Sequence, residues 1–600
     1  MAVSAPRWDM TNVYPSLESK EFKAAVADYK KQVAALDKFF NSKVSKATAK
    51  TPVKPLAELI GTMVDRINKI QTLSATIFPY LYSFVTTNSR DTVAAKAMSE
   101  FEQASLPMNK LEVRFKAWLG RVAPRLPEAV KANKSAKAHA FFLKEAARQS
   151  KYLMSDPEES LAAEMTLSGG NAFDKLQGTF SSQLTAEVEL DGKVQTLPLT
   201  TIIYLRSHAD EATRRRGYET ENKIYEGTKE VFAACLNGVK GETITLSKRR
   251  GRKDAIELSL VASRIDRKTL DAMLGAMHDS FPMFRKYFKA KAKKLGKEKL
   301  PWWDVFAPMG KADKVYSFQE ARGFILENFG RFSPELSAFA KRAFDKKWID
   351  AEQRDGKRAG AYCTEVQGPK ESRVFANFDG TFDAVGTLAH ELGHAFHNEC
   401  AYQAGKTVLQ QLTPMTLAET ASIMCETIVS EAVLASTKDP QVVLGTLESQ
   451  VQGASQVVVD IYSRYLFEKE VFDRREKAEL SADEICDIME RAQKATYGDG
   501  LDERYLQKFM WTWKPHYYSP GLPFYNYPYA FGLLFGKGLY AIYQQRGAAF
   551  VEDYKNLLAS TGEAQAATLA KRFGIDITTP KFWKDSLALI GQQVDKYCAL

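Results

Sequence analysis

The sequence lacks long apolar runs and paired cysteines. None of its uninterrupted apolar stretches approaches the roughly 20 residues that a membrane-spanning helix needs. The first ten residues contain no apolar core, so we expect neither a secretory signal nor a membrane anchor. Six cysteines lie far apart without a CxxC spacing, which is typical of reduced thiols in a cytosol. We therefore expect a cytoplasmic protein.

The sequence also lacks biased tracts and a strong excess of either charge. Its formal net charge is +10, from 83 Lys and Arg against 73 Asp and Glu, and 45% of the residues are hydrophobic. This is the composition of an ordinary globular protein. Basic clusters at residues 248–253 and 291–299 are not interleaved with aromatic residues. We interpret them as solvated surface and expect no nucleic-acid partner.

Hydrophobic periodicity predicts a mainly helical chain. Apolar residues recur at three and four positions over most of its length, and proline is sparse in the first 160 residues. One exception is residues 186–197, where alternating side chains flank Asp191-Gly192 and predict a β-hairpin. We place a domain boundary directly after this hairpin, which divides the chain into residues 1–197 and 198–600.

A second pair of short strands is predicted at residues 359–366 and 372–378, just before a cluster of histidines. The free edge of such a strand could bind an extended peptide through main-chain hydrogen bonds. An ordinary strand pair that shields the core explains the pattern equally well. The candidate substrate-binding residues on the first strand are Gly360, Ala361 and Tyr362.

Histidine is scarce, and three of the seven histidines fall within eight residues. The segment from His390 to His394 reads H-E-x-x-H. On a helix, residues four apart share one face with Cβ atoms roughly 5–6 Å apart, so both imidazoles can bind one Zn²⁺. Glu391, about 100° round the helix from His390, can take a proton from water activated by the metal and pass it to a leaving amine. This pattern is typical of metalloproteases.

A third protein ligand is expected, because catalytic zinc sites use three side chains and leave a position for water. His397 shares the helical face but lies roughly 10 Å along the axis from His390, so we interpret it as a packing or supporting residue. On the next predicted helix, Glu419 is the favoured ligand, although a helix capping box is its competing role. Glu426 lies on the same face and could orient a histidine.

An aromatic segment near the C-terminus, residues 511–529, holds five tyrosines and the only histidine after His397. Its prolines and glycine predict a loop rather than a core helix. Tyrosine hydroxyls and imidazole N–H groups can stabilise the oxyanion of a tetrahedral intermediate. We favour His516 for this role, with Tyr525 and Tyr529 behind it. Packing between helices is the alternative for these rings.

Taken together, these motifs resemble oligoendopeptidase F, of the thimet-oligopeptidase family of zinc peptidases. The resemblance is carried by residues 8–17, 360–362, 375–378, 387–397, 418–422 and 516–532. It implies a mainly α, zincin-type, two-part helical body around a deep substrate channel, with a small β-sheet beside the active-site helix. Such a channel admits short peptides.

The resemblance also implies roles for individual residues. One Zn²⁺ per chain would be bound by His390, His394 and Glu419, with Glu391 as the base. His516 and a loop tyrosine, among Tyr525, Tyr527 and Tyr529, would stabilise the transition state.

Three functional hypotheses follow. The first is a zinc metalloendopeptidase that hydrolyses internal bonds of short oligopeptides. The second is a zinc metallocarboxypeptidase of similar helical fold, which would need a basic residue for a free C-terminal carboxylate; a peptide blocked at both ends distinguishes the two. The third is a non-catalytic peptide-binding protein, against which the intact Glu391 argues. The expected partners are oligopeptide substrates, without an obligatory protein partner.

Overall fold

Helices form most of the chain and the sheets are small, which confirms the predicted fold class. The computed structural model describes residues 5–190, 192–310 and 315–600. Internal contacts group the chain into two compact units. The first comprises Met1–Leu153, Lys314–Ala432 and Ile542–Phe573, and the second comprises Met154–Asp313, Val433–Ala541 and Gly574–Leu600.

The first unit has an extensive buried core, in which the Trp118 side chain is fully buried and donates a hydrogen bond to the carbonyl of Ala47. Its helices are α1 (Lys20–Phe39), α2 (Val53–Thr87), α3 (Thr92–Arg121), α4 (Leu126–Ala132), α5 (Lys134–Ala138), α6 (Ala140–Gln149), α14 (Phe318–Phe332), α15 (Pro334–Asp345), α16 (Phe382–Gln403), α17 (Met415–Ala418), the start of α18 (Thr420–Ser436), the end of α23 (Tyr527–Arg546), α24 (Val551–Ala559) and α25 (Ala566–Arg572).

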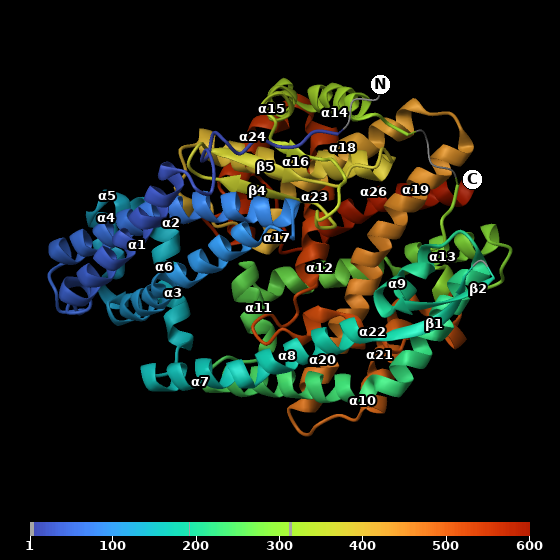
Figure 1. Ribbon diagram of the computed structural model, residues 1–600, viewed down its shortest axis with the longest axis horizontal. Coiled ribbons are helices and arrows are strands. Elements are labelled where there is room, and N and C mark those ends of the chain that lie inside the picture. Colours follow the sequence, from blue (N-terminus) through green and yellow to red (C-terminus); the bar gives the residue numbers. More distant parts are fainter. Residues whose placement is uncertain (1–4, 191, 311–314) are drawn as a thin grey trace. The chain divides into compact units, whose positions relative to one another are not determined.

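A three-stranded sheet in the first unit packs against α16 (Figure 1). Its strands are β3 (Ile349–Asp350), β4 (Tyr362–Val366) and β5 (Glu371–Phe375), in the order β3-β5-β4. β4 runs antiparallel to β5, and β3 runs parallel to it. The two predicted strands are confirmed, and the two-residue β3 was not predicted. β4 forms one edge of the sheet.

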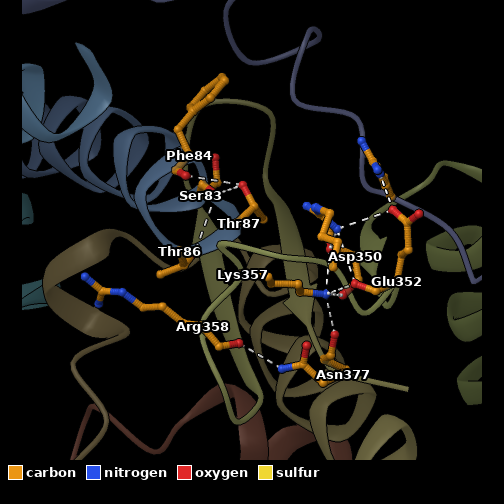
Figure 2. Close-up of polar contacts among 12 residues, drawn as sticks. Ser83, Phe84, Thr86, Thr87, Asp350, Glu352, Lys357, Arg358 and Asn377 are labelled. Carbon is orange, nitrogen blue, oxygen red and sulfur yellow. Dashed lines mark hydrogen bonds and ion pairs between the residues drawn. The ribbon is translucent and has the colours of Figure 1, made fainter. Parts of the chain in front are cut away.

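A buried lysine holds the loop that leads into β4 (Figure 2). The Lys357 ammonium lies 2.7 Å from a carboxylate oxygen of Asp350 and donates to the carbonyls of Asp350, Glu352 and Ala376. Asn377, which follows β5, donates to the carbonyls of residues 358 and 360 in the same loop. These bonds satisfy carbonyl groups of the loop, and so they fix the start of the edge strand.

We expect the substitution Lys357→Met to lower the free energy of unfolding by about 3 kcal/mol, because it removes one partner of a buried ion pair. The Asp350 carboxylate, only 1% exposed, would keep Arg354 alone as its cationic partner. Urea denaturation measures the change. The matched control is the exposed Lys346, whose change to Met should stay within about 0.5 kcal/mol. Equal stability of both variants would contradict the prediction.

The second unit contains the predicted hairpin. Strands β1 (Thr185–Leu190) and β2 (Lys193–Pro198) pair antiparallel, with Ala186 opposite Leu197; Asp191 of the predicted turn lies outside the described residues. The helices are α7 (Asp156–Ser168), α8 (Gly170–Gln183), α9 (Leu199–Tyr204), α10 (Glu211–Arg249), α11 (Ala255–Ser263), α12 (Arg267–Asp279), α13 (Phe281–Lys294), the end of α18, α19 (Pro440–Ser455), α20 (Ile461–Arg475), α21 (Ala482–Tyr497), α22 (Met510–Trp513), the start of α23 and α26 (Pro580–Ala599).

The division into domains 1–197 and 198–600 stays a prediction, because compact units in space need not follow the order of the chain. None of the described helices combines the length and apolar character that crossing a bilayer requires.

Candidate metal centre

The H-E-x-x-H segment lies near the middle of α16, as predicted. The hydroxyl of Thr381 caps the start of this helix by accepting a hydrogen bond from the amide of Ala384. At Gly393 the helix meets the backbone of the segment that opens α18. A Cβ added there would lie 2.6 Å from the carbonyl oxygen of Ala421. A glycine is therefore needed for this close approach, which brings the turn before α18 to the two histidines.

Three side chains converge beside this contact. The Nε2 atoms of His390 and His394 lie 3.2 Å and 3.4 Å from the same carboxylate oxygen of Glu419. One ligand atom from each residue lies within 4.8 Å of the others. Two imidazoles and a carboxylate, with their donor atoms at this spacing, are a donor set that suits a catalytic zinc ion. These residues therefore fit a single metal ion.

Glu419 lies in the turn between α17 and α18 rather than within a helix. Ser422 donates a 2.6 Å hydrogen bond to its carboxylate. Burial alone would raise the pKa of Glu419, but hydrogen bonds from His390 and His394 outweigh it and hold the pKa far below its ordinary value. The carboxylate is therefore ionised and available to a cation.

Glu426 contacts His390 on the Nδ1 side of its ring. It lies two turns after Glu419, on α18, and one of its carboxylate oxygens is 3.0 Å from Nδ1 of His390. A carboxylate at Nδ1 fixes the ring orientation and leaves Nε2 for a metal. Burial opposes protonation of this ring, but hydrogen bonds with Glu419 and Glu426 raise the pKa of His390 to about 10.

Glu391 lines a pocket of about 680 Å³. The residue is only 7% exposed. Burial raises the pKa of Glu391, while His390 and His394 act to lower it. A carboxylate whose pKa is shifted toward neutrality is suited to accept and return a proton. The other pocket-lining residues are Ala361, Tyr362, Cys363, Thr364, Glu365, His390, His394, His397, Asn398, Gln411, Leu412, Thr413, Ala418 and Glu419.

His397 packs in the interior of the first unit. Its Nε2 lies 2.9 Å from the hydroxyl of Thr561 and 3.1 Å from the carbonyl of Leu558. The Glu419 carboxylate meets the Nε2 atoms of His390 and His394 instead. Burial lowers the pKa of His397 to about 4, so its imidazole is neutral near pH 7.

We expect His397 to make the fold sensitive to acid. The unfolded chain binds a proton at the ordinary pKa of 6.5, whereas the folded chain does so only near 4. Stability is therefore intact above pH 6.5 and falls as the pH drops toward 4, by about 3 kcal/mol. Urea midpoints at pH 7 and pH 4.5 measure the loss. The loss of stability between the two pH values should be smaller in His397→Gln than in the wild type. In the control His278→Gln, whose ring is exposed, it should equal the wild-type loss. An equal loss in all three proteins would refute this assignment.

The candidate transition-state donors belong to the second unit. The rings of His516 and Tyr525 stack, with centroids 4.7 Å apart and planes at 13°. Tyr529 donates a 3.1 Å hydrogen bond to the hydroxyl of Tyr525. Burial, with the nearby cations Arg464 and Lys514, lowers the pKa of His516 to about 4.

The aromatic segment is only partly a loop, because α23 begins at Tyr527. Tyr527 is buried, and its hydroxyl bonds with Ser259 and Ser263. It therefore packs between helices, as the alternative reading of these rings expected.

The candidate substrate strand lies next to the histidines. Ala361 and Tyr362 line the pocket together with Glu391. The Tyr362 ring stacks on Phe375 with centroids 4.9 Å apart, and its hydroxyl bonds to Thr86. The carbonyl of Gly360 accepts a hydrogen bond from Asn377. Sequence reasoning missed the next pocket-lining residues of the strand, Cys363, Thr364 and Glu365, although their place on the same predicted strand was a usable signal.

Comparisons with known proteins show that the chain is similar to oligopeptidases. A sequence model of Oligopeptidase F matches residues 125–185. The group B oligopeptidase PepB of Streptococcus agalactiae is 22% identical over 593 residues, covering 96% of this chain and 94% of that protein. Oligopeptidase PepF of Bacillus subtilis is 22% identical over 482 residues, covering 79% and 70%.

Solved structures share the fold. A protein of Chlamydophila abortus superposes with a TM-score of 0.85 at 18% identity, covering 99% of this chain and 98% of that one. Oligoendopeptidase-F from Enterococcus faecium gives a TM-score of 0.69 at 19% identity, covering 96% and 98%. The sequence model of peptidase family M3 matches residues 204–589, well over half of the chain. The chain therefore belongs to peptidase family M3.

Proposed function

We propose that this peptidase is a zinc metalloendopeptidase that hydrolyses internal bonds of short oligopeptides. The observation that carries the proposal is the convergence of His390, His394 and Glu419 beside a buried glutamate, Glu391, in one pocket. The names of the oligopeptidases to which the chain is similar support the substrate class.

We propose His390, His394 and Glu419 as the ligands of one Zn²⁺, because this donor set is typical of catalytic zinc. When bound there, zinc supplies polarisation of the scissile carbonyl and acidification of water to a pKa of about 7. Glu391 takes the proton from the attacking water and returns it to the leaving amine. Glu426 holds the ring of His390 in place through its Nδ1.

We propose that the edge strand β4 and the residues before it, Gly360, Ala361 and Tyr362, hold the main chain of the peptide. An edge strand offers unpaired N–H and C=O groups to an extended chain. Main-chain pairing is largely independent of sequence and therefore suits a general oligopeptidase.

We propose His516 and Tyr525 or Tyr529 as donors to the oxyanion. A neutral imidazole keeps one N–H to donate, and the lowered pKa of His516 keeps it neutral. The change His516→Phe should lower kcat by about 10²-fold, in the range found for loss of one oxyanion donor. KM and metal content should stay unchanged. An unchanged kcat would remove His516 from this role.

The deciding experiment measures zinc content together with hydrolysis of an internally quenched oligopeptide blocked at both ends. An endopeptidase contains one zinc ion per chain and cleaves this peptide. Cleavage of unblocked peptides only would favour the carboxypeptidase hypothesis. Zinc binding without any cleavage would favour a peptide-binding protein. We propose a cytoplasmic location, because the six cysteines are free thiols, as is typical of reducing compartments.

A further inference from the structure

Glu365 of the edge strand lies in the same pocket as the candidate metal ligands. Side chains two residues apart on a strand point to the same face, about 7 Å from each other, so Glu365 and Cys363 share a face of β4. Cys363 and Glu391 line the same pocket. Glu365 therefore lies within the pocket that would receive a peptide at the proposed reaction centre.

The carboxylate of Glu365 is held in one orientation. The side-chain amide of Gln367, the residue directly after β4, donates a 3.1 Å hydrogen bond to it. The amide of Gln367 also donates at 2.9 Å to the side-chain carbonyl of Gln411, which lines the pocket from the segment after α16. A carboxylate positioned in this way can select a ligand by the placement of its charge, because it has little freedom to turn away.

Unlike two carboxylates on the adjacent elements β5 and α16, Glu365 has no Lys or Arg partner among the described residues. Glu371 on β5 lies 2.9 Å from Arg373, and Glu399 on α16 lies 2.8 Å from Arg342. Across residues 5–190, 192–310 and 315–600, no Lys or Arg pairs with Glu365. Burial raises its pKa, and the hydrogen bond from Gln367 opposes this shift. A partly desolvated carboxylate without a counter-charge gains when a cation enters the pocket.

We propose that Glu365 selects oligopeptides that carry a basic side chain, Lys or Arg, close to the scissile bond. The inference rests on the proposed function, because the peptide must lie along β4 for its side chain to reach Glu365. A guanidinium or ammonium group supplies the missing counter-charge through charge-assisted hydrogen bonds. An acidic side chain at the same position is repelled. The free N-terminal amine of a peptide offers the same positive charge, so the test must separate these two sources.

The test uses internally quenched peptides blocked at both ends, which removes the N-terminal charge. Arg is compared with citrulline, its neutral analogue of similar shape, at each of three positions on either side of the cleaved bond. At one of these positions kcat/KM should favour Arg by about tenfold or more. In Glu365→Gln the ratio should fall to about one, with the citrulline peptide cleaved as by the wild type. Glu365→Lys should favour Glu over Arg at that position.

The matched control is Glu371→Gln, one strand away, which removes a carboxylate that is already paired with Arg373 and lies outside the pocket lining. This variant should keep the Arg preference. Equal loss of the preference in both variants would show a general effect of charge and overturn the assignment to Glu365. A preference that depends on Glu365 only in peptides with a free N-terminus would also overturn it, in favour of the terminal amine.

Failure of the inference is distinct from failure of the proposed function. Cleavage of the citrulline peptides without an Arg preference at any position would overturn the role of Glu365 and leave the endopeptidase intact. If neither peptide is cleaved, the proposed function fails. Calorimetry on Glu391→Gln then compares the binding of the Arg and citrulline peptides without cleavage. Tighter binding of the Arg peptide that is lost when Glu365 is also changed supports the proposal. Equal binding of the two peptides overturns it.

Discussion

Glu391→Gln should lower kcat/KM for an end-blocked peptide by about 10²–10⁴-fold, the range for loss of a positioned general acid–base group. Gln has nearly the same shape as Glu, so the packing around this buried position is kept, but it cannot take up a proton. Because Glu391 lies beside the proposed ligands rather than among them, the zinc content should match that of the wild type.

Steady-state kinetics and metal analysis on the same preparations measure both quantities. The control is Glu391→Asp, which keeps a carboxylate but shortens its reach, and which should fall between Gln and wild type. An active Gln variant would assign the proton transfer to another residue. A Gln variant that has lost zinc would place Glu391 among the residues that hold the metal.

His394→Gln should remove zinc and, with it, peptidase activity. Loss of a supporting partner of a ligand weakens metal binding by about 10–100-fold, so loss of the ligand itself should exceed that range. The matched control is His397→Gln, one turn along the same helix. His397 bonds to Thr561 rather than to the Glu419 carboxylate, so this variant should keep one zinc ion per chain although its fold is less stable.

Competitive chelation with a zinc indicator measures both affinities. Zinc loss from His397→Gln in the folded state would show that His397 contributes to the metal centre after all. Retention of zinc by His394→Gln would refute the proposed ligand set.

The local part of the site could be predicted from the sequence, because helix geometry alone brings His390 and His394 to one face. Periodicity also predicted that Glu426 shares a face with Glu419, but its contact with Nδ1 of His390 depends on how α18 packs against α16. Glu419 was expected within a helix, yet it lies in a turn, since α17 is only four residues long and ends just before it. Turn positions at the end of such a short helix depend on packing, which periodicity does not report.

Features that depend on distant contacts could not be predicted. The environment of Glu365 is set by Gln367 and by Gln411, 44 residues farther along the chain. The burial of Tyr527 depends on Ser259 and Ser263, more than 260 residues away. β3 has only two residues, too few for an alternating pattern to be seen. Each compact unit also combines three segments that are far apart in the sequence, and no local pattern encodes such an arrangement.

The contact at Gly393 would link occupancy of the proposed metal site to folding. A cation held by α16 and by the turn before α18 would join two segments whose backbones already touch at that glycine. A ligand that binds only the folded state stabilises it by an amount that grows with the logarithm of its concentration, about 2.7 kcal/mol at 100 times Kd. The first unit would then resist unfolding, and proteolysis of its opened form, more strongly where zinc is plentiful, so that the lifetime of the peptidase follows the metal supply.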